Sequence, residues 1–289
     1  MKARLPSHSN NSPKNIIDKI EELAKEVRER WIEFRNATTD SNYEYDDIQK
    51  ALELLFMENF NKIFQEVGKE KLSISLSQCF KDVCVGRGTI LNTNEKPLYS
   101  RFIPDAKYIK NDNRFSPPGI EWLYLVIGDS DESIKKCAEK ECKAKVNNRF
   151  GFCHFELLSQ YANLKIINLT IADNLSYDEI NDHTYTEFCQ SCEKHNCEMP
   201  NKISDNILNS WYLLTLCKIL SEKIFEPVEN CNKKIDYKPF QTLAKYFEEQ
   251  GYVGIKYKST VFDKANNIVL FDKKYVKPCG DIIDYYVSE

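Results

Sequence analysis

The first part of the chain carries apolar residues at helical spacing. Ser12 and Pro13 form a typical N-cap and first-turn pair, and the apolar positions that follow recur every three or four residues. After a polar break, NATTDSNYEYDD, the same spacing returns in a second stretch. We therefore predict an N-terminal helical domain of two or three helices over residues 1–80, whose apolar stripes are buried against other parts of the protein. The two stripes consist of Ile16, Ile20, Leu23, Val27, Trp31 and Phe34, and of Ile48, Leu52, Leu55, Phe56, Phe60, Ile63 and Phe64.

Beyond residue 80 the pattern changes to short runs rich in Val, Ile, Tyr and Phe, which are typical of strands. Helical stretches separate these runs: ESIKKCAEKECKAK, ISDNILNSWYLLTLCKILSEKIF and PFQTLAKYFEEQG, whose final Gly251 suits a helix C-terminus. This pattern predicts an α+β fold over residues 81–289, with a mixed β-sheet core and flanking helices. The predicted strands cover residues 83–91, 121–128, 150–158, 164–170, 254–260 and 267–271.

Composition and charge exclude several function classes. Hydrophobic residues make up 42% of the 289 positions and charged residues 29%, which is ordinary for a globular protein. The net charge of −4 argues against a nucleic-acid-binding surface, which requires a basic face. No apolar run approaches the roughly 20 residues of a membrane span, and the start, MKARLPSHSNNSPKN, lacks the apolar core of a signal peptide. We therefore expect a cytoplasmic protein without nucleic-acid or membrane partners, whose cysteines are mostly reduced, buried thiols.

Familiar catalytic motifs such as GxGxxG, a Walker loop and HExxH are absent. Arg87 lies between two glycines in VGRGTI, which indicates either a backbone open to a ligand or a simple strand-end bulge. Arg114 precedes the turn SPPG, where its planar guanidinium could hold a phosphate bidentately or lie on the surface without a function. For other candidates the residue alone favours a structural role: Tyr124 and Tyr257 in strands, Glu139 and Glu141 on a charged helix, and Ser259 at a strand end.

The order of these elements resembles the RES domain family, which is named for its Arg, Glu and Ser residues. RFSPPGIEWLYL precedes a helix with EKECKA, the strands FGFCHFELL and LKIINLT, and a C-terminal DYKPFQTLAKYFEEQGYVGIKYKST…NNIVLF. The C-terminal stretch is the most specific part: Tyr-x-Pro-x-Gln, a helix, Gly-x-x-Gly-Ile-x-Tyr-x-Ser, and an Asn before an apolar strand. The resemblance covers about residues 83–275 and does not reach the N-terminal helices.

This resemblance implies a fold similar to that of ADP-ribosyltransferases, with NAD+ as the substrate. RES proteins include toxins of toxin–antitoxin pairs that deplete NAD+ by phosphorolysis or hydrolysis, or that transfer ADP-ribose to a protein. It therefore also implies inorganic phosphate as a possible second ligand and an antitoxin as a possible partner. The matching motif positions are Arg87 (alternative Arg101), Arg114, Tyr124, Glu141 (alternative Glu139) and Ser259, with Tyr257 as a further NAD+-binding candidate.

The chemistry implied by the family suits these residue types. When the nicotinamide–ribose bond breaks, nicotinamide leaves as a neutral ring, so no general acid is strictly required. A carboxylate stabilises the positive charge that grows on the ribose, and two arginines hold the pyrophosphate or an incoming phosphate. A tyrosine can stack on a ring, and the serine can hydrogen-bond a phosphate or ribose oxygen.

One departure from the family pattern concerns the segment between the tyrosine and the glutamate. It is longer here because GDSDESIKKCAEKE intervenes, so both Glu139 and Glu141 are open as the motif carboxylate. Residues two apart on a helix point about 200° apart, so only one of the two can face the site.

A second signal is the sequence FCQSCEKHNCE. Cys189, Cys192, His195 and Cys197 combine the thiolate and imidazole ligands that zinc prefers, although within nine residues they would close a structural site very tightly. Zinc patterns usually pair two C-x2-C halves, and no second half follows. The alternative is a cysteine-rich loop in a reducing compartment, within an insertion before the helix at 204–225.

Two function classes remain open from the sequence. In the first, the chain is an enzyme that consumes NAD+, and the presence of all the motif residues favours it. In the second, it is an interaction protein that keeps the fold without turnover and uses its helical part as the working surface. The altered spacing between the tyrosine and the glutamate favours the second class.

Overall fold

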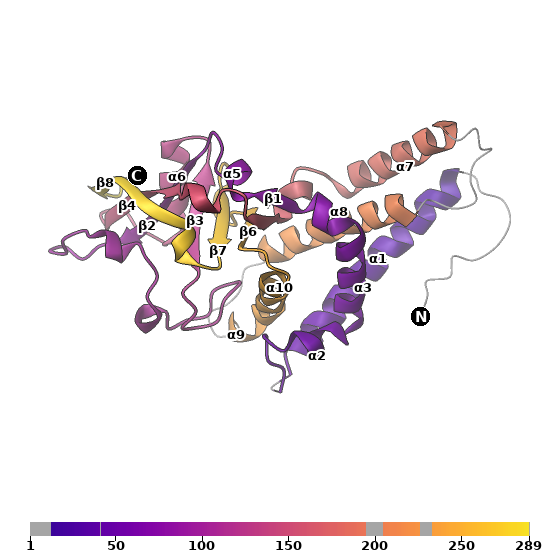
Figure 1. Cartoon of the computed structure of the whole chain (residues 1–289), viewed down its shortest axis with the longest axis horizontal. Coiled ribbons are helices and arrows are strands. Elements are labelled where there is room, and N and C mark those ends of the chain that lie inside the picture. The colour runs from indigo at the N-terminus through magenta and orange to yellow at the C-terminus, as the bar shows by residue number, and fades with distance from the viewer. Residues whose placement is uncertain (1–12, 41, 195–204, 226–232, 289) are drawn as a thin grey trace.

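A computed structural model describes residues 13–40, 42–194, 205–225 and 233–288. A β-sheet lies at one end of the molecule, and long helices extend away from it (Figure 1). The sheet is mixed, helices flank it, and a series of helices precedes it in the chain, so the predicted α+β class is confirmed. None of the helices in the described ranges is long and apolar enough to cross a membrane.

The N-terminal part is mainly helical, but it also adds a strand to the sheet. The second predicted stripe is divided between two helices, because Leu54 adopts an extended conformation between them. Residues Ser73–Ser75 form strand β1, so the purely helical prediction for the first 80 residues is wrong at this point. The helices are α1 (Pro13–Thr38), α2 (Ile48–Leu52), α3 (Leu55–Ile63), a π-helical turn (Phe64–Gly68), α4 (Lys69–Lys71) and α5 (Leu76–Cys79).

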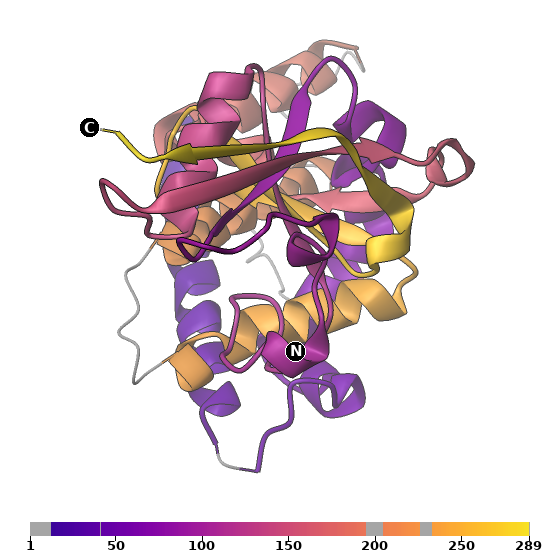
Figure 2. The same ribbon diagram turned by 90° about the vertical axis from the view of Figure 1, so that its left-hand side faces the viewer.

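The eight strands have the order β1-β5-β6-β7-β3-β2-β4-β8. β5 and β6 pair in parallel, whereas the other neighbouring pairs are antiparallel. All the predicted strands are present, and β8 is an additional long strand that lies beside β4 at the sheet edge (Figure 2). The strands beyond β1 are β2 (Cys84–Ile90), β3 (Leu123–Gly128), β4 (Arg149–Leu157), β5 (Lys165–Asn168), β6 (Gly254–Lys258), β7 (Asn266–Leu270) and β8 (Val276–Tyr286).

The later helices include one that the sequence pattern did not predict. Helix α7 carries Cys189 and Cys192, so the alternative of a cysteine-rich loop is wrong for these two positions. Helix α8 packs against both α7 and α1. The helices are α6 (Asp131–Glu141), α7 (Tyr177–Lys194), α8 (Asp205–Phe225), α9 (Lys233–Asp236) and α10 (Lys238–Glu249), and short 3-10 turns cover Tyr99–Arg101, Ala106–Tyr108, Ser159–Tyr161, Leu169–Ala172 and Lys273–Tyr275.

The apolar stripes of the N-terminal helices share a core with the C-terminal half of the chain. Trp31 of α1 lies 5.3 Å from Phe240 of α10, and Phe60 of α3 lies 5.8 Å from Tyr246, measured between ring centroids. The same buried cluster includes Ile255 of β6. The division near residue 80 stays a prediction, and its two parts are joined by this common core.

The two glycines beside Arg87 are explained by the packing of aromatic rings. A Cβ atom at Gly86 would lie 2.2 Å from Cζ of Phe152, and one at Gly88 would lie 2.2 Å from Cζ of Phe150. Both rings come from the neighbouring strand β4. The prediction that these glycines open the backbone to a ligand is therefore wrong, and so is the bulge alternative, because β2 pairs regularly with β4 through Arg87.

Candidate functional site

The central strands of the sheet bring the motif residues together. β6, β7, β3 and β2 are consecutive neighbours, so residues distant in sequence share one region of the sheet. Arg87 and Arg114 both act electrostatically on Tyr124 of β3. Tyr257 of β6 interacts in turn with Tyr124, Arg114 and Glu141. We call Arg87, Arg114, Tyr124, Glu141, Tyr257 and Ser259 the candidate site.

Arg87 is a partly buried cation that lacks a full set of hydrogen bonds among the described residues. Its Nη1 atom is inaccessible to solvent and has no hydrogen-bond partner among the described residues. Burial lowers the pKa of Arg87 below its ordinary value, and the groups that act on it most strongly are Cys142, Tyr124 and another cation, Arg101. A buried charge without a counter-ion is costly, so this environment favours the arrival of an anion.

Arg114, the second arginine that acts on Tyr124, has the same incomplete hydrogen bonding. Its Nη1 atom is buried and unpartnered in the described part of the chain. The guanidinium carbon lies 5.0 Å from the ring centre of Tyr237 and 5.6 Å from that of Phe240, so aromatic faces support the cation. Arg114 is therefore not an ordinary surface arginine, whereas a contact between its guanidinium and a phosphate stays a prediction.

The turn that carries Arg114 is held in place from several directions. Gly119 closes it with φ +83°, a conformation that favours glycine, and its N–H donates to the Ile109 carbonyl at 3.0 Å. Gln241 of α10 donates from Nε2 to Asp112 Oδ1 and to the Asn113 carbonyl, both at 3.1 Å. The backbone next to Arg114 is thus fixed before any ligand binds.

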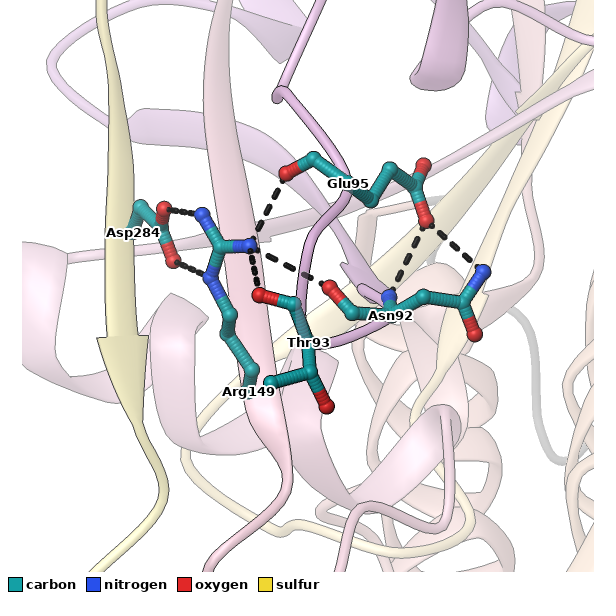
Figure 3. A network of polar contacts seen from close by, with 5 residues as sticks. All are labelled: Asn92, Thr93, Glu95, Arg149 and Asp284. Atoms are coloured by element: carbon teal, nitrogen blue, oxygen red, sulfur yellow. Dashed lines mark hydrogen bonds and ion pairs between the residues drawn. The ribbon is translucent and has the colours of Figure 1, made fainter.

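Arg149 is an arginine of the same protein whose guanidinium nitrogens all have hydrogen-bond or ion-pair partners (Figure 3). Its Nε donates to Asp284 at 2.9 Å, and its Nη2 forms an ion pair with the same carboxylate. Its Nη1 donates to the carbonyls of Asn92, Thr93 and Glu95 at 3.2, 2.9 and 2.9 Å. Every guanidinium nitrogen of Arg149 is used to join strands and a loop, unlike those of Arg87 and Arg114.

Glu141 presents a carboxylate that two buried donors hold. Ser259 Oγ donates to Glu141 Oε1 at 2.9 Å, and Asn267 Nδ2 donates to the same oxygen at 2.6 Å. Ser259 is 0% exposed and Asn267 is 7% exposed, whereas Glu141 is exposed. Since Glu141 lies in the last turn of α6, where the helix dipole disfavours an anion, these donors offset an unfavourable position.

The hydroxyl group of Ser259 takes part in three hydrogen bonds within the protein. It donates its hydrogen to Glu141 and accepts from Cys137 Sγ and from the Val261 N–H, each at 3.3 Å. Burial raises the pKa of Cys137 to about 11, which keeps this thiol protonated near neutral pH. In this arrangement Ser259 supports Glu141, and a direct contact between the serine and a ligand stays a prediction.

Tyr257 is buried and Tyr124 is partly buried, and both are neutral. Burial raises the pKa of Tyr124 and of Tyr257 above the ordinary value. The Tyr124 hydroxyl lies 2.9 Å from Ser116 Oγ, in the turn after Arg114, and the Tyr257 ring packs 4.8 Å from that of Phe115. Both tyrosines therefore connect the sheet to the Arg114 turn, and ring stacking on a ligand stays a prediction.

The alternative residues have other partners. Glu139 accepts from the Tyr285 hydroxyl of β8 at 2.6 Å, so it reaches a different part of the molecule from Glu141. Arg101 is exposed and pairs with Glu95 at 2.6 Å. The geometry favours Glu141 and Arg87 as the site residues, whereas their catalytic roles stay predictions.

Sequence reasoning assigned no role to Asn267, Tyr237 or Gln241, although each stands in the quoted C-terminal motifs. A signal was available for Asn267, because asparagine is depleted in strands and this one precedes the apolar run IVL. Tyr237 and Gln241 carry no such signal, since their role depends on a turn more than a hundred residues earlier in the chain.

The predicted zinc site cannot be placed from the structure. His195, Cys197 and the side chain of Cys192 lie outside the described residues. Cys189 is partly buried and packs against the main apolar core. Within the described ranges, no group of three or more His, Cys, Asp or Glu residues could hold a metal ion.

Comparisons with known proteins complete the description of the site. No protein-family model matches the chain, and no curated protein matches it. The chain is similar to a solved structure described as the crystal structure of the M. tuberculosis MbcT–MbcA toxin–antitoxin complex. The TM-score is 0.37 and the identity 10%, over 78% of this chain and 92% of that one. A likeness at this level carries no conclusion about the activity, substrate or partners of this chain.

Proposed function

We propose that this chain binds NAD+ and cleaves its nicotinamide–ribose bond. The observation that carries the proposal is a pair of arginines that both act electrostatically on Tyr124 and whose Nη1 atoms are buried without a hydrogen-bond partner in the described part of the chain. Such a pair is suited to an anion with several oxygens, such as the pyrophosphate of NAD+ or inorganic phosphate. The resemblance of the surrounding motifs to the RES family supports NAD+ as that ligand.

Glu141 supplies the group that the bond cleavage requires. When the C–N bond breaks, its electron pair leaves with nicotinamide, which becomes neutral, and positive charge develops on the ribose. The exposed carboxylate, held by Ser259 and Asn267, can stabilise that charge without reorganising. An oxygen of water or phosphate then bonds to the ribose carbon, and water releases a proton to solvent.

The direct test is to incubate the purified full chain with NAD+, with and without inorganic phosphate, and to identify the products by chromatography and mass spectrometry. We expect free nicotinamide to appear either in both incubations or only in the one that contains phosphate. ADP-ribose as the second product indicates hydrolysis, whereas a phosphorylated ADP-ribose indicates phosphorolysis. ADP-ribose attached to a protein indicates transfer. Intact NAD+ under both conditions would contradict the proposal and favour a binding protein. The family resemblance also suggests an antitoxin as a partner that controls this activity.

A further inference from the structure

Asn267 occupies a position where its side chain requires a partner. It is 7% exposed and begins the apolar run of β7, between β6 and β3. Burying an amide without a hydrogen bond costs free energy, and Asn267 meets this requirement by donating Nδ2 to Glu141 Oε1 at 2.6 Å. Because Nδ2 donates to an exposed carboxylate, the contact links the interior of the sheet to the candidate site.

We propose that Asn267 is a positioning residue that fixes the Glu141 carboxylate for the reaction. Its catalytic consequence rests on the proposed function, whereas the contact itself does not. Ser259, which directly follows β6, and Asn267 of β7 donate to the same oxygen, Oε1. Two donors on one oxygen restrict rotation of the carboxylate, which leaves Oε2 to meet a ligand.

An aspartate at position 267 would have the same shape as the asparagine but would add a negative charge. A second carboxylate at 2.6 Å from Glu141 Oε1 could not stay ionised beside the first, so the two would share a proton. Glu141 acts electrostatically on Cys137, Cys142 and Tyr257, and the cations Lys140 and Arg114 also act on Cys137 and on Tyr257 respectively. Burial raises the pKa of Cys137 and of Cys142 to about 11 and that of Tyr257 well above its ordinary value, so all three stay neutral near pH 7.

The experiment uses the full chain with Asn267→Asp and Asn267→Leu, and Asn266→Asp as the matched control. Asn266 is the adjacent residue of β7, so its side chain lies on the opposite face of the strand. The Glu141 carboxyl ¹³C resonance is titrated by NMR in each variant. We expect Asn267→Asp to move the titration midpoint upward by about one pH unit or more, and Asn266→Asp to leave it unchanged.

Turnover of NAD+ gives the second readout. We expect kcat to fall about tenfold or more in both Asn267 variants, as when a charged hydrogen bond is lost, with KM for NAD+ little changed. In Asn267→Asp the acid limb of the pH–rate profile moves to higher pH. Asn267→Leu removes the Nδ2 donor without adding a charge. If Asn267→Asp does not fold, the kcat of Asn267→Leu tests the positioning role.

The outcomes separate this inference from the proposed function. An NMR midpoint that moves in Asn267→Asp while NAD+ stays intact supports the contact and contradicts the proposed function. NAD+ cleavage with unchanged kcat and pH profile in the Asn267 variants supports the function and overturns the positioning role. An unchanged midpoint in Asn267→Asp overturns the inference whatever the activity.

Discussion

Replacing Glu141 by glutamine should lower NAD+ turnover by about 10²–10³-fold, the scale seen when one transition-state stabiliser is lost. Glutamine keeps the shape of the side chain, and its amide oxygen can still accept from Ser259 and Asn267. It lacks the negative charge that stabilises the developing charge on the ribose. We therefore expect kcat to fall while NAD+ affinity stays nearly the same, as measured by steady-state kinetics and equilibrium binding.

Glu139→Gln is the matched control for this prediction. Glu139 lies on the same helix and accepts from Tyr285, so the change removes an equal charge at a position away from the candidate site. Turnover of this variant should stay close to that of the unmodified chain. If Glu139→Gln were inactive and Glu141→Gln active, the motif carboxylate would be the other glutamate. If both were fully active, a carboxylate would have no part in the reaction.

Replacing Arg87 by methionine should weaken NAD+ binding at least tenfold and also make the free protein more stable. The loss of binding follows from the charged hydrogen bond that the guanidinium would give to the ligand, about 1.5–3 kcal/mol. The gain in stability follows because the variant no longer buries a cation that lacks a full set of partners. We expect a free energy of unfolding higher by at least about 1 kcal/mol, seen as a raised Tm without ligand.

Arg149→Met provides the contrast for Arg87. Because Asp284 and three loop carbonyls use every nitrogen of Arg149, its removal should lower Tm and leave a carboxylate unpaired. NAD+ affinity measured below the unfolding transition should change little. A lower Tm in Arg87→Met, with NAD+ affinity retained, would mean that Arg87 is also a structural arginine.

Much of the fold could be predicted from the hydrophobic pattern, and the misses have physical causes. β1 spans Ser73–Ser75 between helices, which is too short to show an alternating pattern. β8 contains Pro278 and Gly280, which usually indicate a break in a strand. It tolerates them because it lies at the sheet edge, where one side of the backbone needs no partner. Helix α7 is rich in polar residues, so its apolar stripe was weak.

The candidate site was predictable as a set of residues but not as a geometry. The motifs identified Arg87, Arg114, Glu141 and Ser259 individually. The contact of Ser259 with Glu141 joins two elements that are far apart in the chain, and neither residue's local pattern encodes it. The incomplete hydrogen bonding of the two arginines is likewise a property of packing, which depends on the whole fold.

The central claim is that the two arginines of the candidate site hold the anionic part of NAD+. Titration calorimetry of NAD+ into Glu141→Gln tests it most directly, because this variant should bind NAD+ while its turnover is about 10²–10³-fold slower. The same titration is then repeated with Glu141→Gln combined with Arg114→Ala. The account predicts saturable binding by the first protein and at least tenfold weaker binding by the second. Equal affinity in the two proteins, or no binding by either, would contradict it.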